Sequence, residues 1–288
     1  MAELLKIKGL HKTYGDFSLK DINLRVLQGC IVGLIGKNGA GKTTTIRSAL
    51  GIVVSDSGEV SILGQPPTAS SKQDIGIVFD SCSFPDELTV RDVAQMMEAA
   101  YVRWDSDAFF KKMGEFLVPL DRKMKELSRG MGMKLMLAIA LSHQAKLLIL
   151  DEATAGLDPI ARDEILAVLR DYMQDPNCGI LMSTHITSDL EKIADYIVCI
   201  EDGRVLFSCE KDVITELAGI AHCRKDQFEE LINNNGLKAG VTRFSSHEYG
   251  VDLLVADRLS FTKRFPEIAV ERASIDEYMR LTLKGDLL

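Results

Sequence analysis

Short apolar runs alternate with longer segments of helical periodicity between residues 30 and 200 of the chain. The runs at 30–35, 75–79, 146–150 and 179–183 are almost wholly apolar, which is typical of strands buried on both faces. In the segments between them, apolar residues recur three and four positions apart, which predicts helices. Strands that alternate with helices favour an α/β fold with a mainly parallel, covered sheet.

The first thirty residues and the segment before residue 145 follow other patterns. Apolar and polar residues alternate over Leu4–Lys8 and again over Ile22–Val26, which predicts an antiparallel β region with the first strand at a sheet edge. Helical periodicity runs from Thr89 to about Met113, and a further helix is expected over Asp107–Phe116. Because these helices precede the next strand, we expect a helical subdomain of about residues 84–145 inserted into the core.

Two later helices begin with capping residues. Asp158-Pro159 combines an aspartate at the N-cap with proline at the first helical position. Ser188-Asp189-Leu190-Glu191 has the form of a capping box, in which a serine and a glutamate three residues later satisfy each other's backbone N–H groups. We therefore expect one helix to start at residue 158 and a shorter one at residue 188.

The character of the chain changes again beyond about residue 221. A strand-like segment covers Gly250–Val255, a short helical segment lies around 258–265, and a final helical segment covers 275–283. These predict a small α+β appendage. We expect a main domain over residues 1–220 and the appendage over residues 221–288.

A glycine-rich segment connects the first buried strand to the helix that follows it. Glycines allow backbone N–H groups to converge on phosphate oxygens, and the N-terminus of the helix adds a partial positive charge. In this arrangement Lys42 reaches the β- and γ-phosphates and the Thr43 hydroxyl binds Mg²⁺. A βα turn with an incidental lysine is the alternative, and the strand–loop–helix context argues against it, so we predict a nucleoside triphosphate site. The segment reads Gly36-Lys37-Asn38-Gly39-Ala40-Gly41-Lys42-Thr43-Thr44.

Acidic and imidazole side chains follow two other buried strands. Asp151 and Glu152 end the run at 146–150, where a carboxylate can hold Mg²⁺ and its neighbour can polarise a water for attack on the γ-phosphate. His185 follows the run at 179–183 and can donate to a γ-phosphate oxygen. Parallel strands place these ends at one sheet edge, beside the glycine-rich loop. The other four histidines lack such a setting and are assigned no role.

Composition narrows the range of partners. With 46% hydrophobic and 26% charged residues the chain has the composition of an ordinary globular protein, and its net charge of −8 argues against nucleic acid as a partner. Six cysteines contain no C-x-x-C pair, which is typical of reduced core cysteines in a cytosolic protein. No apolar run approaches the ~20 residues of a membrane span. We expect any work at a membrane to go through a partner.

The motifs together resemble those of the ATP-binding subunit of an ABC transporter, over about residues 2–210. The resemblance implies a P-loop ATPase fold with ATP and Mg²⁺ as cofactors. It also implies a head-to-tail dimer in which Ser128 of one subunit serves the γ-phosphate bound by the other. The matched positions are Tyr14 as the adenine platform, residues 36–43 as the phosphate loop, 127–131 (Leu-Ser-Arg-Gly-Met, with Ser128 and Gly130) as the signature, Asp151 with Glu152, Asp158 in the D-loop at 155–158, and His185 as the switch.

Two positions depart from the family pattern. Arg129 replaces the first glycine of the signature, which is compatible with a contact made by the Ser128 side chain and the Gly130 N–H. Asp80 stands where the family carries a glutamine that binds Mg²⁺ and connects to the membrane subunit. Aspartate is shorter and charged, so that it either binds Mg²⁺ directly or acts through water.

The resemblance also points to a branch of the family and to partners. The Ser-Arg-Gly-Met form, Ala-Gly-Leu-Asp-Pro at 155–159 and Ser-Ile-Asp-Glu-Tyr-Met at 274–279 resemble exporters of drugs and antibiotics whose membrane subunits are separate chains. We therefore expect a Mg²⁺-dependent ATPase at the inner face of the cell membrane, paired with a copy of itself or a paralogue and with a multi-span transmembrane subunit. The alternative is a soluble ABC-type ATPase that acts on nucleic acid or ribosomes. That class would predict a basic patch, a coiled-coil insertion or tandem cassettes, none of which the sequence contains.

Overall fold

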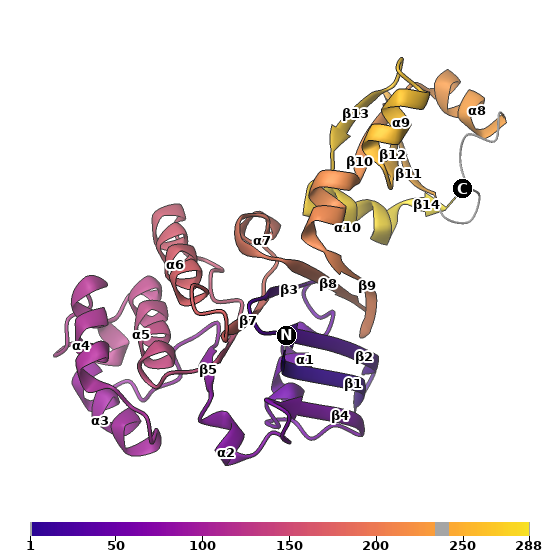
Figure 1. Ribbon diagram of the computed structural model, residues 1–288. Coiled ribbons are helices and arrows are strands. Elements are labelled where there is room, and N and C mark those ends of the chain that lie inside the picture. Colours follow the sequence, from indigo (N-terminus) through magenta and orange to yellow (C-terminus); the bar gives the residue numbers. More distant parts are fainter. Residues whose placement is uncertain (1, 234–241, 288) are drawn as a thin grey trace. The chain divides into compact units, whose positions relative to one another are not determined.

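The computed structural model describes residues 2–233 and 242–287, and the chain forms two compact units, Met1–Ser208 and Cys209–Leu288 (Figure 1). The domain boundary that we expect at residue 220 lies twelve residues after the structural boundary at Ser208. The structural division comes earlier because residues 219–223 form a strand that pairs on both sides with strands of the second unit. As a division into functional domains, 1–220 and 221–288 stay a prediction.

A six-stranded sheet in the order β5-β6-β7-β3-β8-β9 is the centre of the first unit. All pairings from β5 through β8 are parallel, and every residue of β3, β6 and β7 is buried. This confirms the mainly parallel, covered sheet predicted from the apolar runs. Its strands are β3 (Ile31–Ile35), β5 (Ile75–Val78), β6 (Leu147–Asp151), β7 (Gly179–Ser183), β8 (Tyr196–Glu201) and β9 (Arg204–Glu210).

A second sheet of the same unit is antiparallel, in the order β2-β1-β4. It consists of β1 (Glu3–Tyr14), β2 (Phe17–Leu27) and β4 (Ser57–Ile62). The antiparallel character was expected, but the edge position of the first strand was wrong, since β1 pairs with both neighbours. Alternation within β1 reports its buried face and not its number of partners, and β4 joins it from more than forty residues away in sequence.

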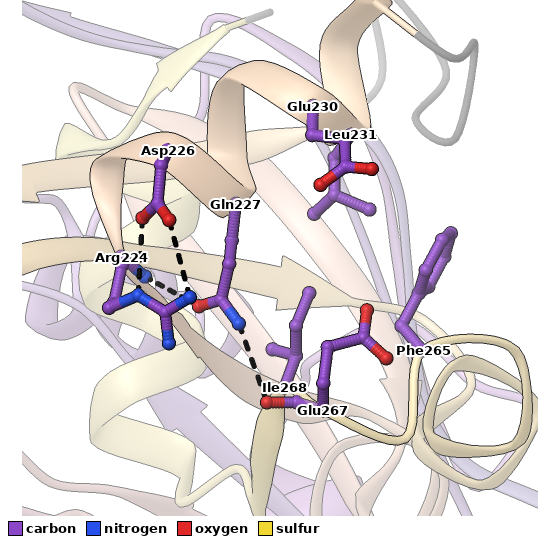
Figure 2. Close-up of a pocket in the computed structure, with 8 residues that line it drawn as sticks. All are labelled: Arg224, Asp226, Gln227, Glu230, Leu231, Phe265, Glu267 and Ile268. Carbon is purple, nitrogen blue, oxygen red and sulfur yellow. Dashed lines mark hydrogen bonds and ion pairs between the residues drawn. The ribbon is translucent and has the colours of Figure 1, made fainter.

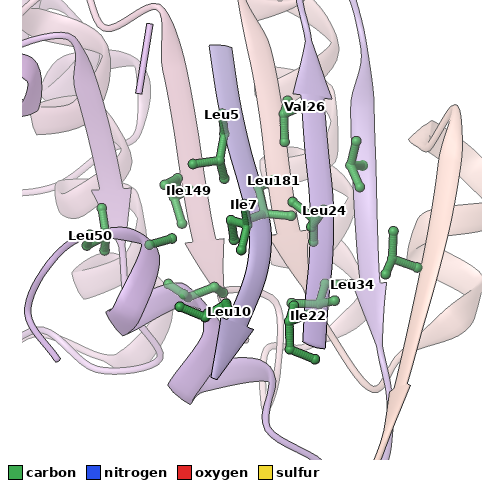
Figure 3. Close-up of a cluster of buried hydrophobic side chains, with 14 of the residues drawn as sticks. Leu5, Ile7, Leu10, Ile22, Leu24, Val26, Leu34, Leu50, Ile149 and Leu181 are labelled. Atoms are coloured by element: carbon green, nitrogen blue, oxygen red, sulfur yellow. The ribbon is translucent and has the colours of Figure 1, made fainter. Parts of the chain in front are cut away.

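Buried apolar side chains of the two sheets form one cluster (Figure 3). Leu5 and Ile7 of β1 and Leu24 of β2 lie in the same cluster as Ile149 of β6 and Leu181 of β7. Full burial of a side chain of this size stabilises a fold by about 1.5–3 kcal/mol. The antiparallel sheet is thereby fixed against the parallel one, with helix α1 (Lys42–Ala49) contributing Ile46 and Ala49 to the cluster.

The predicted helical subdomain contains more breaks than its periodicity suggests. The helix expected from Thr89 to Met113 is two helices, α3 (Val90–Ala100) and α4 (Ser106–Glu115). The break occurs because Tyr101 leaves the helical conformation and stacks its ring on His143, with the ring centroids 3.9 Å apart. Asp105 then caps α4 by accepting from the N–H of Ala108. The helical elements between β4 and β6 are α2 (Ala69–Lys72), α3 (Val90–Ala100), α4 (Ser106–Glu115), η1 (Met124–Glu126) and α5 (Arg129–Ser142).

Of the two helices with predicted capping residues, α6 (Pro159–Tyr172) has the expected cap and α7 (Thr187–Ile193) does not. Helix α6 begins after Asp158, as expected, and the carboxylate accepts from the N–H groups of Ile160 and Ala161. Helix α7 starts one residue before the predicted capping box, and its N-cap has no side-chain hydrogen bond. The predicted capping box was wrong because the N-cap is Ile186, which places Ser188 inside the first turn of the helix.

The second unit is a small α+β fold, as predicted. Its antiparallel sheet has the order β13-β10-β12-β11-β14, and one face carries a core cluster that includes Phe228, Leu231, Leu253 and Ile268. Its elements are η2 (Val213–Leu217), β10 (Gly219–Cys223), α8 (Lys225–Asn233), β11 (Arg243–His247), β12 (Gly250–Val255), α9 (Arg258–Arg264), β13 (Ala269–Arg272), α10 (Ile275–Lys284) and β14 (Asp286–Leu287).

A cavity of about 160 Å³ lies at the surface of this second unit (Figure 2). On one side Arg224 pairs with Asp226 at 3.2 Å, and Gln227 donates to the carbonyl oxygen of Glu267 at 3.4 Å. Its apolar lining residues are Leu231, Phe265 and Ile268. None of the site residues predicted from the sequence lines this cavity.

Candidate functional site

Four neighbouring strands of the parallel sheet end at one edge, and the predicted site residues follow their ends. The order β5-β6-β7-β3 is continuous in the sheet. Asp80 lies two residues beyond β5, Glu152 follows β6, His185 lies two residues beyond β7, and Gly36 follows β3. Parallel pairing therefore places these segments along one edge, as the sequence predicted.

The phosphate loop, residues 36–44, requires glycine at two positions where its backbone approaches other groups. Gly36 has a φ of 154°, and a Cβ atom there would lie 2.2 Å from the carbonyl oxygen of Ile200. Gly41 has a φ of 115°, and its Cβ atom would lie 2.5 Å from the side chain of Leu19. Gly41 is also the N-cap of α1 and gives that helix no side-chain cap, which leaves the N–H groups of the first turn to an anion.

The other loop residues differ in exposure and partners. Lys37 forms an ion pair with Glu201, and the hydrogen bond to that carboxylate raises the pKa of Lys37. Ala40 is buried, and its carbonyl oxygen accepts from the N–H of Gly203 at 3.0 Å. The turn between β8 and β9 is thereby hydrogen-bonded to the phosphate loop. Exposed positions are Lys37, Asn38 and Gly39, and half-buried ones are Thr43 and Thr44.

The Lys42 ammonium points back into the loop. Its side chain begins α1 and is only 5% exposed. Nζ donates to the carbonyl oxygens of Gly36 at 2.8 Å and Lys37 at 3.3 Å, and it lies 3.2 Å from Oε1 of Glu152. The loop thus holds a buried cation at its centre, where phosphate oxygens would be bound.

Asp151 is held in place by a serine that we did not identify from the sequence. Asp151 is 4% exposed, and Oδ1 accepts a short hydrogen bond from Oγ of Ser183. The two residues are register partners in the β6–β7 pairing. Only that register could have indicated Ser183, because nothing in its local sequence marks it as a partner of Asp151.

The backbone at Glu152 adopts a left-handed conformation with a φ of 54°. For a residue other than glycine this costs about 1–2 kcal/mol. Its N–H donates to the carbonyl oxygen of Ser183 at 3.0 Å and to Oγ of the same residue at 3.2 Å, and these bonds hold the strained backbone. In this conformation Oε1 of Glu152 lies 3.2 Å from Nζ of Lys42.

The carboxylate of Glu152 bridges two other predicted site residues. Oε1 faces Lys42, while Oε2 lies 2.7 Å from Nδ1 of His185 and also accepts from the His185 N–H at 3.3 Å. Because a carboxylate only accepts, neutral His185 carries its proton on Nδ1 in this arrangement. The structure therefore joins Lys42, Glu152 and His185 into one connected group, which is the strongest part of the predicted site.

Asp80 is the least defined member of the site. It is exposed, and Oδ1 lies 3.5 Å from Oγ of Ser81. Among the residues that the structure describes, no hydrogen bond or ion pair joins Asp80 to Thr43 or Asp151. A direct role on Mg²⁺ stays a prediction.

Tyr14 is an exposed aromatic residue at the end of β1. Its side chain is 46% exposed, and the ammonium of Lys12 lies 5.2 Å from the ring centroid. Lys12 is itself paired with Asp56 at 2.9 Å. An exposed aromatic ring is chemically suited to stack on a purine, and the adenine contact of Tyr14 stays a prediction.

Ser128, Gly130 and Asp158 lie at the beginnings of α5 and α6 and not with the Lys42 group. Ser128 is the N-cap of α5 and accepts from the N–H of Met131 at 3.3 Å, while Asp158 caps α6. Hydrogen bonds from the N–H groups of Ala161 and Ile160 lower the pKa of Asp158. In the described part of the chain, neither Ser128 nor Asp158 forms a hydrogen bond or ion pair with Lys42, Glu152 or His185.

The starts of these two helices nevertheless lie close together. The guanidinium of Arg129 lies against Gly156, and a Cβ atom on that glycine would be 3.2 Å from Cζ of the arginine. A Cβ atom on Gly130 would lie 3.9 Å from the side chains of Leu157 and Ala161. The signature segment and the D-loop therefore form one neighbouring surface of the unit.

The loop around Lys42 and the acidic pair at the end of β6 have the arrangement of a P-loop nucleotide-binding protein. The family model for the ABC transporter matches residues 19–155 of the chain. The bacitracin transport ATP-binding protein BcrA of Bacillus licheniformis is 35% identical over 214 residues, which cover 72% of this chain and 69% of the relative. The lantibiotic transport ATP-binding protein SrtF of Streptococcus pyogenes is 31% identical over 235 residues, covering 80% and 96%.

Solved structures agree with these relatives. One described as an ATP-binding subunit of an ABC transporter superposes with a TM-score of 0.68 and 27% identity, covering 81% of this chain and all of the other. Another, cbiO1 from Clostridium perfringens, described as part of the ABC transporter complex cbiONQ, gives a TM-score of 0.63 and 26% identity, covering 75% and 92%. The chain belongs to the ATP-binding subunits of ABC transporters, a family that binds ATP and hydrolyses it for transport.

Proposed function

We propose that this subunit closes head to tail with a second ATPase subunit on two MgATP molecules and so drives export through a separate transmembrane protein. The observation that carries the proposal is the connected group of Lys42, Glu152 and His185 at the sheet edge. In this group Lys42 supplies a cation for phosphate, and Glu152 supplies a base for the attacking water. His185 supplies a group that can reach the γ-phosphate. The group is placed for hydrolysis of the terminal phosphate.

The roles proposed within one subunit follow from the chemistry of each side chain. Lys42 neutralises the β- and γ-phosphates, Glu152 orients and deprotonates the attacking water, and His185 donates to a γ-phosphate oxygen. Tyr14 stacks on the adenine ring, since it is the exposed aromatic residue at the end of β1. Together these residues bind, orient and activate the reactants.

The residues present also fit Mg²⁺. That ion prefers hard oxygen ligands and keeps water and phosphate oxygens in its coordination shell. Thr43 offers a hydroxyl in the first turn of α1, and Asp151 offers a carboxylate whose direction is fixed by Ser183. When bound, the ion supplies positive charge to the phosphate oxygens. Asp80 would join this site directly or through water.

The second subunit is proposed because Ser128 and the start of α5 are separate from the Lys42 group of their own chain. The Ser128 hydroxyl and the N-terminus of α5 together suit a phosphate. A partner that places its own phosphate loop against Ser128 and Gly130 would complete both sites at once. A copy of this chain and a paralogue both satisfy this geometry.

A groove beside Asp80 is the proposed contact for the transmembrane protein. It has a volume of about 180 Å³, and its walls come from β5, the residues that follow it, α3 and α5. An apolar helical segment of the transmembrane protein, with large side chains, would fit such walls. Its occupant would lie next to Phe79 and Asp80, at the end of a strand of the catalytic sheet. The lining residues are Ile77, Phe79, Ser83, Phe84, Met97, Tyr101, Met136 and Ile139.

The proposed position is the inner face of the cell membrane, held there by the partner. None of the helices in the described ranges combines the length and apolar character that a bilayer-crossing helix needs. BcrA and SrtF, which the chain resembles, are named as transport proteins for bacitracin and a lantibiotic. We propose an exported cargo of comparable, peptide-like antibiotic chemistry.

Purification of the tagged chain from detergent-solubilised membranes tests this function. The proposal requires a multi-span protein in near-stoichiometric amount, together with ATP hydrolysis that depends on Lys42. A Ser83→Arg variant, at an exposed residue that lines the groove, should lose the multi-span partner and keep ATP hydrolysis. Leu117→Asp, at an exposed position outside the groove, should keep both. Recovery with ribosomes or nucleic acid and without a membrane protein would instead favour the soluble alternative.

A further inference from the structure

The half-buried side chain of Arg162 on α6 faces the buried carboxylate of Asp189 on α7 without completing a hydrogen bond. Nε of Arg162 lies 3.9 Å from Oδ2 of Asp189, and Asp189 is only 1% exposed. Neither of these two buried atoms has a hydrogen-bond partner among the described residues. Buried groups of this kind are usually paired, because an uncompensated polar atom in the interior is unfavourable.

The pair connects two segments that belong to the catalytic machinery. Arg162 also donates from Nη2 to the carbonyl oxygen of Leu157 at 3.3 Å, in the loop that precedes Asp158. Asp189 lies four residues after His185, on the helix that the His185 segment leads into. Arg162 and Asp189 therefore lie between the loop at 156–158 and the histidine that contacts Glu152.

We propose that Arg162 and Asp189 form a positioning pair that closes when the two ATPase subunits close. A shift of about 1 Å would bring the two atoms from 3.9 Å into hydrogen-bond range. Pressure of a partner on the loop at 156–158 would act on Arg162 through the Leu157 carbonyl oxygen. Closure of the pair would then fix α7, and with it His185 relative to Glu152. The proposal rests on the dimer proposed above.

The same two helices carry a second ion pair, which provides a matched control. Nζ of Lys192 lies 2.7 Å from Oδ1 of Asp163, with side chains 47% and 63% exposed. This ion pair is already formed and exposed to solvent, so it contributes little to the stability of the fold. Its two charged groups have no gap to close. A variant at Asp163 removes a charge between α6 and α7 without touching the buried pair.

The first test compares Asp189→Asn with Asp163→Asn in the full chain. We expect Asp189→Asn to lower kcat by about tenfold to 100-fold, the scale of a catalytic group displaced by about 1 Å, and to leave KM for ATP within about twofold. Asp163→Asn should keep the wild-type kcat. An unchanged kcat in Asp189→Asn, or an equal loss in both variants, would overturn the proposal.

A double variant separates positioning from simple stability. Replacement of a buried ion pair by apolar side chains of similar volume is often neutral or stabilising. The double variant Arg162→Met, Asp189→Leu should therefore retain the wild-type Tm but show the same loss of kcat as Asp189→Asn. A double variant with wild-type Tm and wild-type kcat would overturn the proposal as well.

The dimer on which the proposal depends is measured separately. In a Glu152→Gln background, ATP should convert the chain to a dimer in size-exclusion chromatography with light scattering. Absence of ATP-dependent dimers in that background would refute the proposed subunit closure itself. If dimers form and Asp189→Asn still turns over at the wild-type rate, the positioning role alone is refuted.

Discussion

The ammonium of Lys42 and the carboxylate of Glu152 form an ion pair across the sheet edge, with 3.2 Å between Nζ and Oε1. The pair joins the residue proposed to bind phosphate to the residue proposed to activate water. In the proposed roles, phosphate oxygens would compete with Glu152 for Lys42, because both are anionic ligands of the same buried ammonium. Binding of the γ-phosphate and release of the base toward water would then be coupled through one cation.

Glu152→Gln should nearly abolish turnover while ATP still binds. The amide keeps the shape of the side chain and can accept from His185, but it cannot take a proton from water, so that a loss of about 100-fold to 10,000-fold in kcat is expected. Phosphate release and fluorescent-nucleotide binding measure the two effects. Glu115→Gln, at an exposed glutamate paired with Lys112, is the control and should be fully active. Normal hydrolysis by Glu152→Gln would show that the base lies elsewhere.

Asp80→Ala should weaken the dependence of ATPase activity on Mg²⁺. Removal of a metal ligand, or of a group that orients a metal ligand, commonly lowers metal affinity by about tenfold to 100-fold. The Mg²⁺ concentration that gives half-maximal activity should therefore rise by at least about tenfold in Asp80→Ala. Titration of the ATPase rate with Mg²⁺ measures the change. Ser81→Ala, which removes the neighbouring hydroxyl, should behave as wild type. An unchanged Mg²⁺ titration of Asp80→Ala would remove Asp80 from the metal site.

Ser128→Asp should separate the capping role of Ser128 from its proposed role toward the partner's nucleotide. Aspartate caps a helix as well as serine does, so that Tm should stay at or above the wild-type value. Its charge repels a γ-phosphate, and ATP-dependent dimers and turnover should therefore be lost. Thr68→Asp, at the exposed N-cap of α2, where the side chain also accepts from a backbone N–H, is the matched control and should keep both. Dimers that form normally with Ser128→Asp would contradict the composite site.

His143 should make the stability of the chain depend on pH. The imidazole is buried, with its nitrogens 2.9 Å and 3.0 Å from the carbonyl oxygens of Ile139 and Ile75, and burial lowers the pKa of His143 below its usual value of 6.5. The unfolded chain therefore takes up the proton first as the pH falls. The stabilising contribution of neutral His143 is complete above about pH 6.5 and is lost as the pH falls through the lower folded-state pKa.

Thermal unfolding across this pH range measures that effect. His143→Gln can still donate to one of the two carbonyl oxygens, but it does not titrate. Its Tm should be lower than that of wild type above pH 7, and its decline between pH 7 and pH 5 should be shallower. Parallel Tm profiles for the two proteins would show that His143 does not contribute to acid sensitivity.

The parallel sheet could be predicted from sequence because each strand is buried on both faces and reads as a continuous apolar run. Strand neighbours could not be predicted in the same way. The position of β1 between β2 and β4 depends on pairing with residues distant in sequence. The break at Tyr101 likewise depends on stacking against His143, which local periodicity does not contain.

Within the site, residue identities could be predicted from motifs at strand ends, and contacts could not. The bridge from Lys42 through Glu152 to His185 depends on the left-handed backbone of Glu152, a conformation that a glutamate gives no sequence reason to expect. Ser183 was missed because only the β6–β7 register places it opposite Asp151. The binding and catalytic roles of all the predicted site residues stay predictions, those of Lys42, Glu152 and His185 included.

The order of the two units along the chain has a consequence for synthesis. Every strand of the parallel sheet and every residue proposed for ATP hydrolysis lie within the first 210 residues. The second unit begins at Cys209 and builds its core from its own side chains. On the ribosome, the first unit can therefore fold around its nucleotide while the last residues are still being added, since domains generally fold as units from the N-terminus onward.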